Sequence, residues 1–266
     1  MLVRPTVLLA ILWIVAGSAP VSAQELNTEG PEANPGRPTV STPATITPVG
    51  YLQFETGTIG AWHSPEFSSQ QSVNEVLKFS VSTRFEVLAA IEPFAHSRSQ
   101  GQSTNAAGDL SLGLQGIVYH GEGASPTIAL SYFRRVYGGS APDLDFGSPR
   151  NSVVVLGSAD GRNFHFDVNA MLNEVVEGPV HRLQLGQTLS ISHPLRKRFG
   201  LSGEIWHFTQ PFLNSNAVGN LWALSYTANR NLVFDGGFNR GLTSTSTRWE
   251  VFVGFTYLLP HKLLKR

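Results

Sequence analysis

The chain has 266 residues, no cysteine, and equal numbers of basic and acidic side chains, nineteen of each. The absence of cysteine excludes a disulfide framework, a thiolate metal site and a lipid-anchor cysteine, and the balanced charge excludes a global field that would recruit nucleic acid. Only 14% of the residues are charged, well below the ~25% usual in soluble domains. The composition therefore favours a fold that hides much of its surface from bulk water.

Residues 1–23 have the pattern of a secretory signal peptide. Arg4 gives a positive start, residues 7–15 form an unbroken apolar core, and Val-Ser-Ala at 21–23 is a small-residue cleavage site. An uncleaved anchor helix is the alternative, but the apolar core is short for that role. We predict an exported protein whose mature chain starts at Gln24. Beyond the signal, no apolar run reaches the ~18 residues that a membrane helix needs.

Residues 24–49 form a proline-rich arm. Prolines at this density remove the backbone donors that a strand requires, so no regular element is predicted here. The segment is an extended or mobile lead-in, a short plug, or an arm folded into the lumen of the downstream domain, and the sequence leaves these alternatives open. The prolines are Pro31, Pro35, Pro38, Pro43 and Pro48.

After the arm, segments of about ten residues alternate between apolar and polar side chains, which is typical of β-strands. At 163–172, for example, Phe164 and Phe166 share one face while His165 and Asp167 share the other. No segment has a convincing helical period. We predict about twelve strands, near 50–63, 75–82, 85–93, 108–119, 126–137, 150–158, 163–173, 180–192, 199–210, 219–229, 231–240 and 248–258.

The connections between these strands fall into two kinds. Tight ones are expected at 82–84, 159–162, 193–198 and 229–230, and long ones at 63–74, 94–107, 138–149, 174–179, 210–218 and 241–247. Short turns on one rim and long loops on the other are typical of an outer-membrane barrel with periplasmic turns and external loops. We predict an all-β fold, a transmembrane antiparallel up-and-down β-barrel over residues 50–259, followed by a basic tail at 260–266.

The two faces of the strands indicate what surrounds the barrel. In GDLSLGLQG at 108–116, Leu110, Leu112 and Leu114 form one face and polar residues the other. In the last strand, the corresponding face has Trp249 and Tyr257 at its ends and aliphatic residues between them, which matches the aromatic girdles of membrane barrels. Because lipid cannot hydrogen-bond to backbone, a spanning sheet must close on itself. The leucine face is therefore predicted to meet lipid.

Four stretches resemble a known family: RPTVSTPATITPVGYLQFETG at 37–57, TRFEVLAAIEPF at 83–94, GDLSLGLQG at 108–116 and WEVFVGFTYLL at 249–259. Through these stretches the chain resembles the outer-membrane channel family named for the MetA pathway of phenol degradation. The resemblance extends over most of the mature chain. The resemblance implies a passive channel or transporter for small aromatic or hydrophobic solutes in the cell outer membrane, with outer-membrane lipid as the other partner. One departure is that the chain continues past its last strand into PHKLLKR.

The face opposite the leucines has charges of both signs. Twelve strands give a lumen wider than that of the ~8-strand barrels that side chains fill, and narrower than that of a 16-strand porin. Charges in such a space brace the wall, line a solute path, or do both. An apolar solute would use a gap in the wall or a patch such as Phe133, Trp206 and Phe252. The predicted lumen-lining residues are Glu55, Lys78, Glu86, Glu92, Asp109, Arg135, His165, Asp167, Arg182, Glu204, Asp235, Arg248 and Glu250.

Two other functions remain as alternatives. A structural or adhesive barrel would bind a partner through its external loops, and the loop at 138–149 is acidic. A barrel lipid hydrolase would place a histidine beside a serine on its outer surface, but neither His181 nor His207 has such a neighbour in the sequence. His165 and Asp167 share a face without a visible third or fourth metal ligand. We expect no enzyme, catalytic residue, metal, cofactor or nucleic-acid partner, and the solute and oligomeric state stay open.

Overall fold

The structure is a computed structural model that describes residues 30–196 and 198–264. The predicted signal peptide and the predicted mature start at Gln24 lie outside the described residues. Within them, no helix is long and apolar enough to cross a membrane. The strands all belong to the unit that begins at Pro31.

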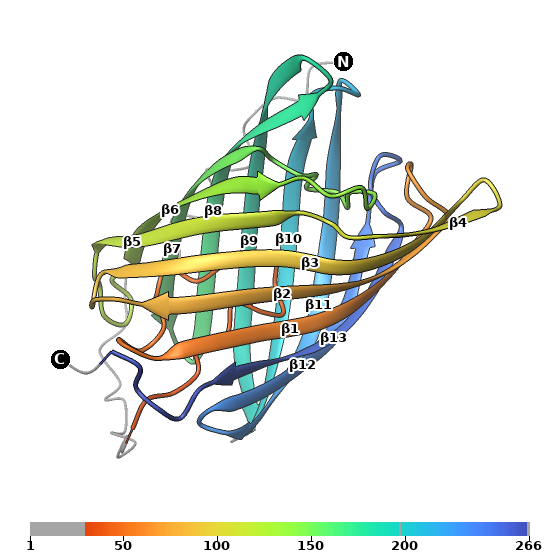
Figure 1. Cartoon of the computed structure of the whole chain (residues 1–266). Helices are drawn as coiled ribbons and strands as arrows, with labels where there is room; N and C mark the ends of the chain where they lie inside the picture. The colour runs from red at the N-terminus through yellow and green to blue at the C-terminus, as the bar shows by residue number, and fades with distance from the viewer. Residues whose placement is uncertain (1–29, 197, 265–266) are drawn as a thin grey trace, which may run out of the picture. The chain divides into compact units, whose positions relative to one another are not determined.

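The strands form one closed antiparallel barrel (Figure 1), which confirms the predicted fold class. Apart from β4, which β3 and β5 bypass by pairing with each other, neighbours in the chain pair, and β1 also pairs with β13, which closes the sheet. β4 pairs with β3 as a protruding hairpin, so the wall has 12 strands. The strands are β1 (Leu52–Trp62), β2 (Ser69–Ser80), β3 (Phe85–Ser99), β4 (Gln102–Ala106), β5 (Leu110–Tyr119), β6 (Thr127–Tyr137), β7 (Asn151–Gly161), β8 (Phe164–Glu177), β9 (Val180–Arg196), β10 (Phe199–Gln210), β11 (Ser215–Asn229), β12 (Leu232–Gly241) and β13 (Trp249–Leu258).

The outer face of the wall is apolar and the inner face is polar, because successive side chains of a strand point to opposite faces. On β5, Leu112 and Leu114 are 50% and 59% exposed, whereas Gln115 on the inner face is 1% exposed. On β13, Val253 is exposed and Glu250 is buried. The leucine face therefore points outward, as the alternation predicts.

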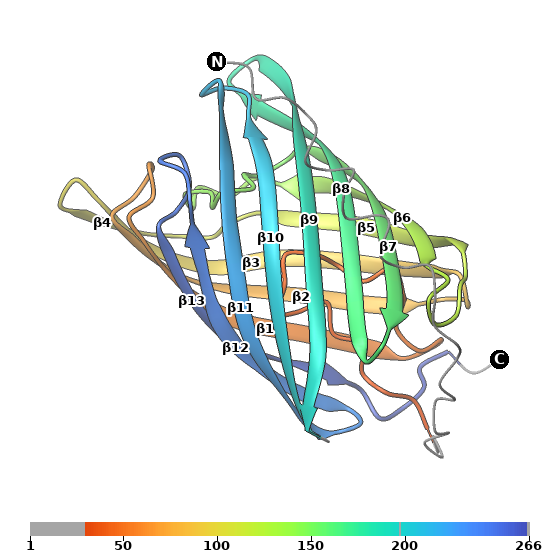
Figure 2. The same ribbon diagram turned by 180° about the vertical axis from the view of Figure 1, so that it is seen from behind.

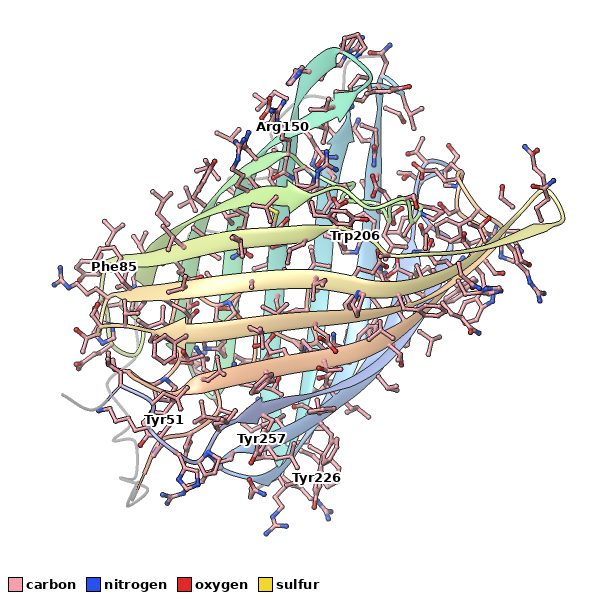
Figure 3. All side chains as sticks on the ribbon, viewed as in Figure 1. Tyr51, Phe85, Arg150, Trp206, Tyr226 and Tyr257 are labelled. Atoms are coloured by element: carbon pink, nitrogen blue, oxygen red, sulfur yellow. The ribbon has the colours of Figure 1, made fainter. Side chains whose placement is uncertain are left out.

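Aromatic rings lie toward both ends of the outer face. We call the end with the β2–β3 turn at 81–84 the turn end, and the opposite end the loop end. Phe85, Tyr226 and Tyr257 lie toward the turn end (Figure 3), and Trp62 faces Trp249 across the β1–β13 pair at the loop end. Rings at both borders of an apolar band are typical of transmembrane barrels.

Several connections are shorter than the sequence pattern predicts. Residues 94–107, expected as a long loop, continue β3 and return as β4, and the loop expected at 174–179 is a turn between β8 and β9. Likewise, β2 starts before the predicted residue 75 and β11 before residue 219. Strand pairing satisfies backbone N–H and C=O groups above the apolar band as well as inside it. Where both faces of a strand are wet, the alternation disappears from the sequence although the strand continues.

The described part of the proline-rich segment, residues 31–49, lies inside the barrel, and we call it the arm (Figures 1 and 2). It enters at the turn end, where Ala33 N–H donates to Arg230 C=O at 2.8 Å, and returns there, where Gly50 N–H donates to Ser80 C=O at 2.8 Å. Between these points it contacts inward side chains of β1, β2, β3, β5, β7, β8, β9, β10 and β12. Of the three alternatives for this segment, the structure has the one in which it occupies the lumen.

The C-terminal tail, described as far as Leu264, folds against the start of the barrel. The N–H groups of Leu263 and Leu264 both donate to Gly50 C=O, at 2.7 and 3.3 Å. Gly50 has a φ of 83°, and a side chain at this position would meet the Leu264 carbonyl. Glycine is therefore required both by the backbone conformation and by the close approach of the tail.

Candidate functional site

The lumen is the candidate site, and one of its most connected side chains is Glu204 on β10. Its carboxylate accepts hydrogen bonds from Val40 N–H at 2.7 Å, Ser41 N–H at 2.7 Å and Ser41 Oγ at 2.6 Å. Ser41 Oγ also lies 2.8 Å from Thr188 Oγ1 on β9. A buried carboxylate needs such donors because its water has been removed, so Glu204 fixes the middle of the arm to the wall.

A second carboxylate, Glu86 on β3, holds the end of the arm. It accepts hydrogen bonds from Thr47 N–H at 2.8 Å and from Thr47 Oγ1 at 2.6 Å, and Ser80 Oγ donates to the same oxygen at 3.1 Å. All of these side chains are buried. The wall therefore recognises the arm largely through its backbone N–H and hydroxyl donors.

Two wall carboxylates, each in an ion pair, hold the start of the arm. Glu55 Oε1 accepts the Gly36 N–H at 2.8 Å and pairs with Lys78 Nζ at 2.6 Å. Arg37 forms an ion pair with Asp235 at 3.1 Å. Side chains at Gly57 and Gly254 would collide with the Arg37 guanidinium, so these two glycines make room for it against the wall.

Amide and hydroxyl side chains complete the contacts with the arm. Asn169 accepts Thr42 N–H at 2.7 Å and donates to Thr42 C=O at 2.9 Å. Gln115 donates to the carbonyls of residues 43–45, and Ser158 Oγ accepts Ala44 N–H at 2.7 Å. Side chains that both donate and accept in this way bind the backbone of an extended segment independently of the segment's own side chains.

At the loop end, the lumen is narrowed by residues 138–150, which we call the mouth loop. Asp145 Oδ1 accepts Thr247 N–H at 2.6 Å and Thr247 Oγ1 at 2.9 Å, and Gln210 donates to the Asp145 carbonyl at 2.8 Å. The ring of Phe146 lies 5.5 Å from that of Phe208, which in turn packs against Trp206. The mouth loop therefore folds back onto β10 and onto the β12–β13 connection.

The acidic side chains around the mouth loop titrate above their usual range. Burial raises the pKa of Asp145, against the effect of its hydrogen bonds from Thr247. Burial also raises the pKa values of Glu66 and Asp143, and neighbouring carboxylates raise them further: Asp143 acts on Glu66, and Asp109 acts on Asp143. The mouth thus gathers several carboxyl groups whose charged forms are disfavoured by burial and, for Glu66 and Asp143, by one another.

The predicted lumen residues divide into three groups by burial. Arg182 and Arg248 are exposed, and Arg182 donates to Pro211 C=O and lies 5.0 Å from the centre of the Phe212 ring, beyond the arm-filled region. Half-buried are Glu92, Asp109, Arg135 and His165, with Asp109 paired to Arg135 at 3.1 Å and His165 within 3.2 Å of Asp167. Buried are Glu55, Lys78, Glu86, Asp167, Glu204, Asp235 and Glu250.

Several residues that matter to the lumen are outside the predicted lumen-lining set. Strand alternation predicts that Gln115 and Asn169 face inward, but that set is restricted to ionisable side chains and leaves them out. Arg37 and Asp145 could not have been found from the sequence. The arm and the mouth loop have no periodic pattern that indicates which way their side chains point. Their partners, Asp235 and Thr247, are 198 and 102 residues away in the chain.

The predicted aromatic patch does not form one open surface. Trp206 (Figure 3) is 1% exposed, donates its indole N–H to Asn239 at 2.8 Å and packs with Phe208 and Ala217. Phe252 belongs to a separate cluster with residues of β11, and Val40 of the arm packs against both clusters. On the outer face, a hollow of about 360 Å³ lies over β1, β12 and β13, with Gly57, Gly254 and Asp235 in its lining.

These features define a transmembrane β-barrel with a polar lumen that contains part of its own chain. No protein-family model and no curated protein sequence matches it. Its structure is similar to an outer membrane channel from Pseudomonas putida F1, with a TM-score of 0.58 and 12% identity over 81% of this chain and 98% of that one. It is also similar to the NanC porin (0.55, 8%, over 78% and 100%) and to the KdgM porin in complex with disordered oligogalacturonate (0.53, 11%, over 77% and 98%). At such identities the similarity establishes the barrel fold.

Proposed function

We propose that this protein is an outer-membrane channel that passes small solutes passively, and that the arm sets the width of its path. The main observation that supports this proposal is that a segment without regular secondary structure occupies the lumen. Hydrogen bonds and an ion pair hold it to the wall. A twelve-strand barrel is too wide for its own side chains to fill. A segment held in this way can shift without any loss of strand pairing.

The proposed solute class is small aromatic or hydrophobic molecules. The sequence resemblance to the family named for the MetA pathway supports this class. The rings of Trp206, Phe208 and Phe252 are at most 5% exposed, so a solute would contact them only where the arm or the mouth loop moves aside. The inward charges of the wall would line the path and discriminate among charged solutes, because charges in a narrow passage act strongly on a permeant ion.

The proposed setting is a cell outer membrane, with residues 1–23 removed as a signal peptide. The turn end, where the arm enters and the chain ends, would then face the periplasm, and the mouth loop would face outward. The exposed apolar side chains of the outer face would contact lipid. The protein would make no covalent bond and use no cofactor.

The alternative functions find less support in the geometry. The acidic loop proposed for adhesion folds inward through Asp145 and Phe146 instead of presenting them to a partner. Of the histidines considered for a hydrolase, His181 is hydrogen-bonded to Glu174 at 2.6 Å and His207 to Asn216 at 3.0 Å. Neither partner is the serine that a hydrolase would use.

Single-channel recording with a lockable arm tests the proposal. Because the chain has no cysteine, the double variant Ala44→Cys/Ser158→Cys gives one designed crosslink between arm and wall, at a contact of 2.7 Å from Ala44 N to Ser158 Oγ. We expect conductance openings in the reduced double variant, fewer in the oxidised form, and no redox effect in either single variant. Deletion of residues 24–47 should give a larger, steadier conductance.

Solute preference is measured separately by liposome swelling. We expect an aromatic acid to enter faster than a sugar of similar size. If neither solute enters, even through the variant lacking residues 24–47, the channel proposal fails and a structural barrel is the better account.

A further inference from the structure

Three buried acceptor atoms at the loop end have no hydrogen-bond donor among the described residues. They are Gln70 Oε1 on β2, Asp145 Oδ2 on the mouth loop and Glu250 Oε1 on β13. All three side chains are buried. An unsatisfied buried acceptor costs free energy, and an unpaired buried carboxylate costs more. Such a group is stable only when a proton or a bound cation compensates it.

The strand register and the mouth loop bring these acceptors to one place. Ala61 on β1 pairs with Gln70 on one side and with Glu250 on the other, so the two long side chains flank one small methyl group across ~10 Å of sheet. Asp145 is bonded to Thr247, three residues before Glu250 in the chain. Its carboxylate lies close enough to that of Glu250 for the two negative charges to repel each other.

The surroundings favour a positively charged ligand. Asp143 and Glu66 add negative charge beside Asp145, and Glu66 is exposed at the rim, which gives a cation a route inward. Among the described residues, no three histidine or acidic side chains gather closely enough to hold a metal ion. The acceptors are spread over three elements and suit the several N–H donors of an ammonium group better than a compact metal ion.

Aromatic rings lie next to the same acceptors. Asn239 hydrogen-bonds Glu250 and also accepts the Trp206 indole N–H at 2.8 Å. Asp145 precedes Phe146, whose ring lies 5.5 Å from Phe208. Trp206 and Phe208 are 1% and 0% exposed, with Phe146 of the mouth loop packed against them. A ligand bound through its cationic end would therefore contact these rings, which favour cations and other rings, only where the mouth loop moves aside.

We propose that Gln70, Asp145 and Glu250 form an outer binding site for the ammonium group of a small aromatic amine. The site is the first one that a solute entering from the loop end would meet. The inference deepens the proposed channel function, because it assigns a solute class to the mouth, but binding at this site does not require conduction.

Isothermal titration calorimetry of the full mature chain in detergent micelles at neutral pH tests the site. The probes are benzylammonium chloride, the uncharged benzyl alcohol of similar shape, and calcium chloride. We expect saturable binding of benzylammonium and none of benzyl alcohol. The near-isosteric changes Glu250→Gln and Asp145→Asn should each weaken benzylammonium binding at least ~10-fold, since each removes one charge from a buried pairing.

The control variant is Glu122→Gln, which removes the same charge from an exposed position between β5 and β6 at the turn end. Its binding should equal that of the unaltered chain, and a gel shift on heating verifies that each variant is folded. Equal binding of benzyl alcohol, binding of calcium alone, or unchanged binding in both site variants would overturn the proposal. Binding without conductance would instead refute the channel function and leave the site standing.

Discussion

The side chains of the lumen do not behave as a generic polar surface, because most of them have specific partners on the arm. Glu204 and Glu86 accept two or more donors each, and Asn169 both donates to and accepts from the same residue, Thr42. A polar residue on the inner face therefore cannot be replaced freely by another polar residue. A large residue in place of the buried Asn169 would displace the arm, even though strand alternation places it harmlessly in a polar interior.

Removing the central carboxylate should release the arm. In Glu204→Ala, the N–H groups of Val40 and Ser41 lose a charged acceptor, at a local cost of about 3 kcal/mol for two such bonds. We expect hydrogen exchange at these amides to accelerate by about 100-fold, while the wall strands stay protected. Glu122→Ala is the matched control. Unchanged exchange in Glu204→Ala would show that other contacts hold the arm.

On the outer face, charge should be destabilising wherever the side chain meets lipid. Val253 on β13 is 59% exposed and central in its strand. We expect Val253→Arg to lower the free energy of unfolding in lipid by about 2–4 kcal/mol, the cost of a cation near the bilayer midplane. Val253→Leu, which keeps the position apolar, should change it little. Equal effects of the two variants in reversible urea unfolding would contradict the lipid-facing assignment.

At the scale of elements, the mouth loop and the arm enter the lumen from opposite ends and are held differently. The arm is fixed by many donors to separate side chains of the wall. The mouth loop depends on Asp145 and on the packing of Phe146, next to carboxylates that repel one another. The packing of the mouth loop therefore depends on pH.

The packing of the mouth loop should loosen as pH rises. Burial, then like charges, raises the pKa values of Glu66 and Asp143 in the folded state, and burial raises that of Asp145. Groups with raised folded pKa values stabilise the packed state fully below their ordinary pKa, and this stability is lost as pH rises through the raised values. We expect hydrogen exchange of mouth-loop amides, normalised for intrinsic rates, to show less protection at pH 8 than at pH 4. Asp143→Asn should reduce the difference, and the amides at 229–231, at the turn end, serve as the unaffected reference.

At the scale of the whole molecule, closure of the sheet joins strands that are distant in sequence. The β1–β13 pair runs from Gln53–Leu258 to Trp62–Trp249, so the wall forms only when both ends of the barrel segment are present. Each of the twelve strands of the wall therefore has two neighbours, and the wall exposes no unpaired strand edge to lipid.

Closure should make unfolding cooperative and visible on gels. We expect the folded protein to migrate differently before and after heating, and a variant lacking β13 to show no such shift, because its sheet stays open. A heat shift retained without β13 would mean that the barrel closes by another pairing.

The sequence by itself determined the class of fold and the direction of the side chains. Alternation with period two, low charge and sorted connections predict a membrane barrel, because lipid outside and a polar interior select opposite residues at successive positions. The leucines of β5 and the aromatic ends of β13 were correctly oriented from this pattern alone. The ends of β3, β8 and β11 were not predicted correctly. Strand pairing continues where both faces of the strand are wet, whereas the alternation of apolar and polar residues stops there.

Only the tertiary structure decided what occupies the lumen. The arm has no periodicity, so its sequence is compatible with a lead-in, a plug or a folded segment, and its partners lie up to 198 residues away in the chain. Likewise, Gln70, Asp145 and Glu250 converge only because β1 lies between β2 and β13 and the mouth loop turns inward. Local pattern reports the environment of each residue, whereas its partners are set by closure of the sheet and by the path of irregular segments, which no local pattern encodes.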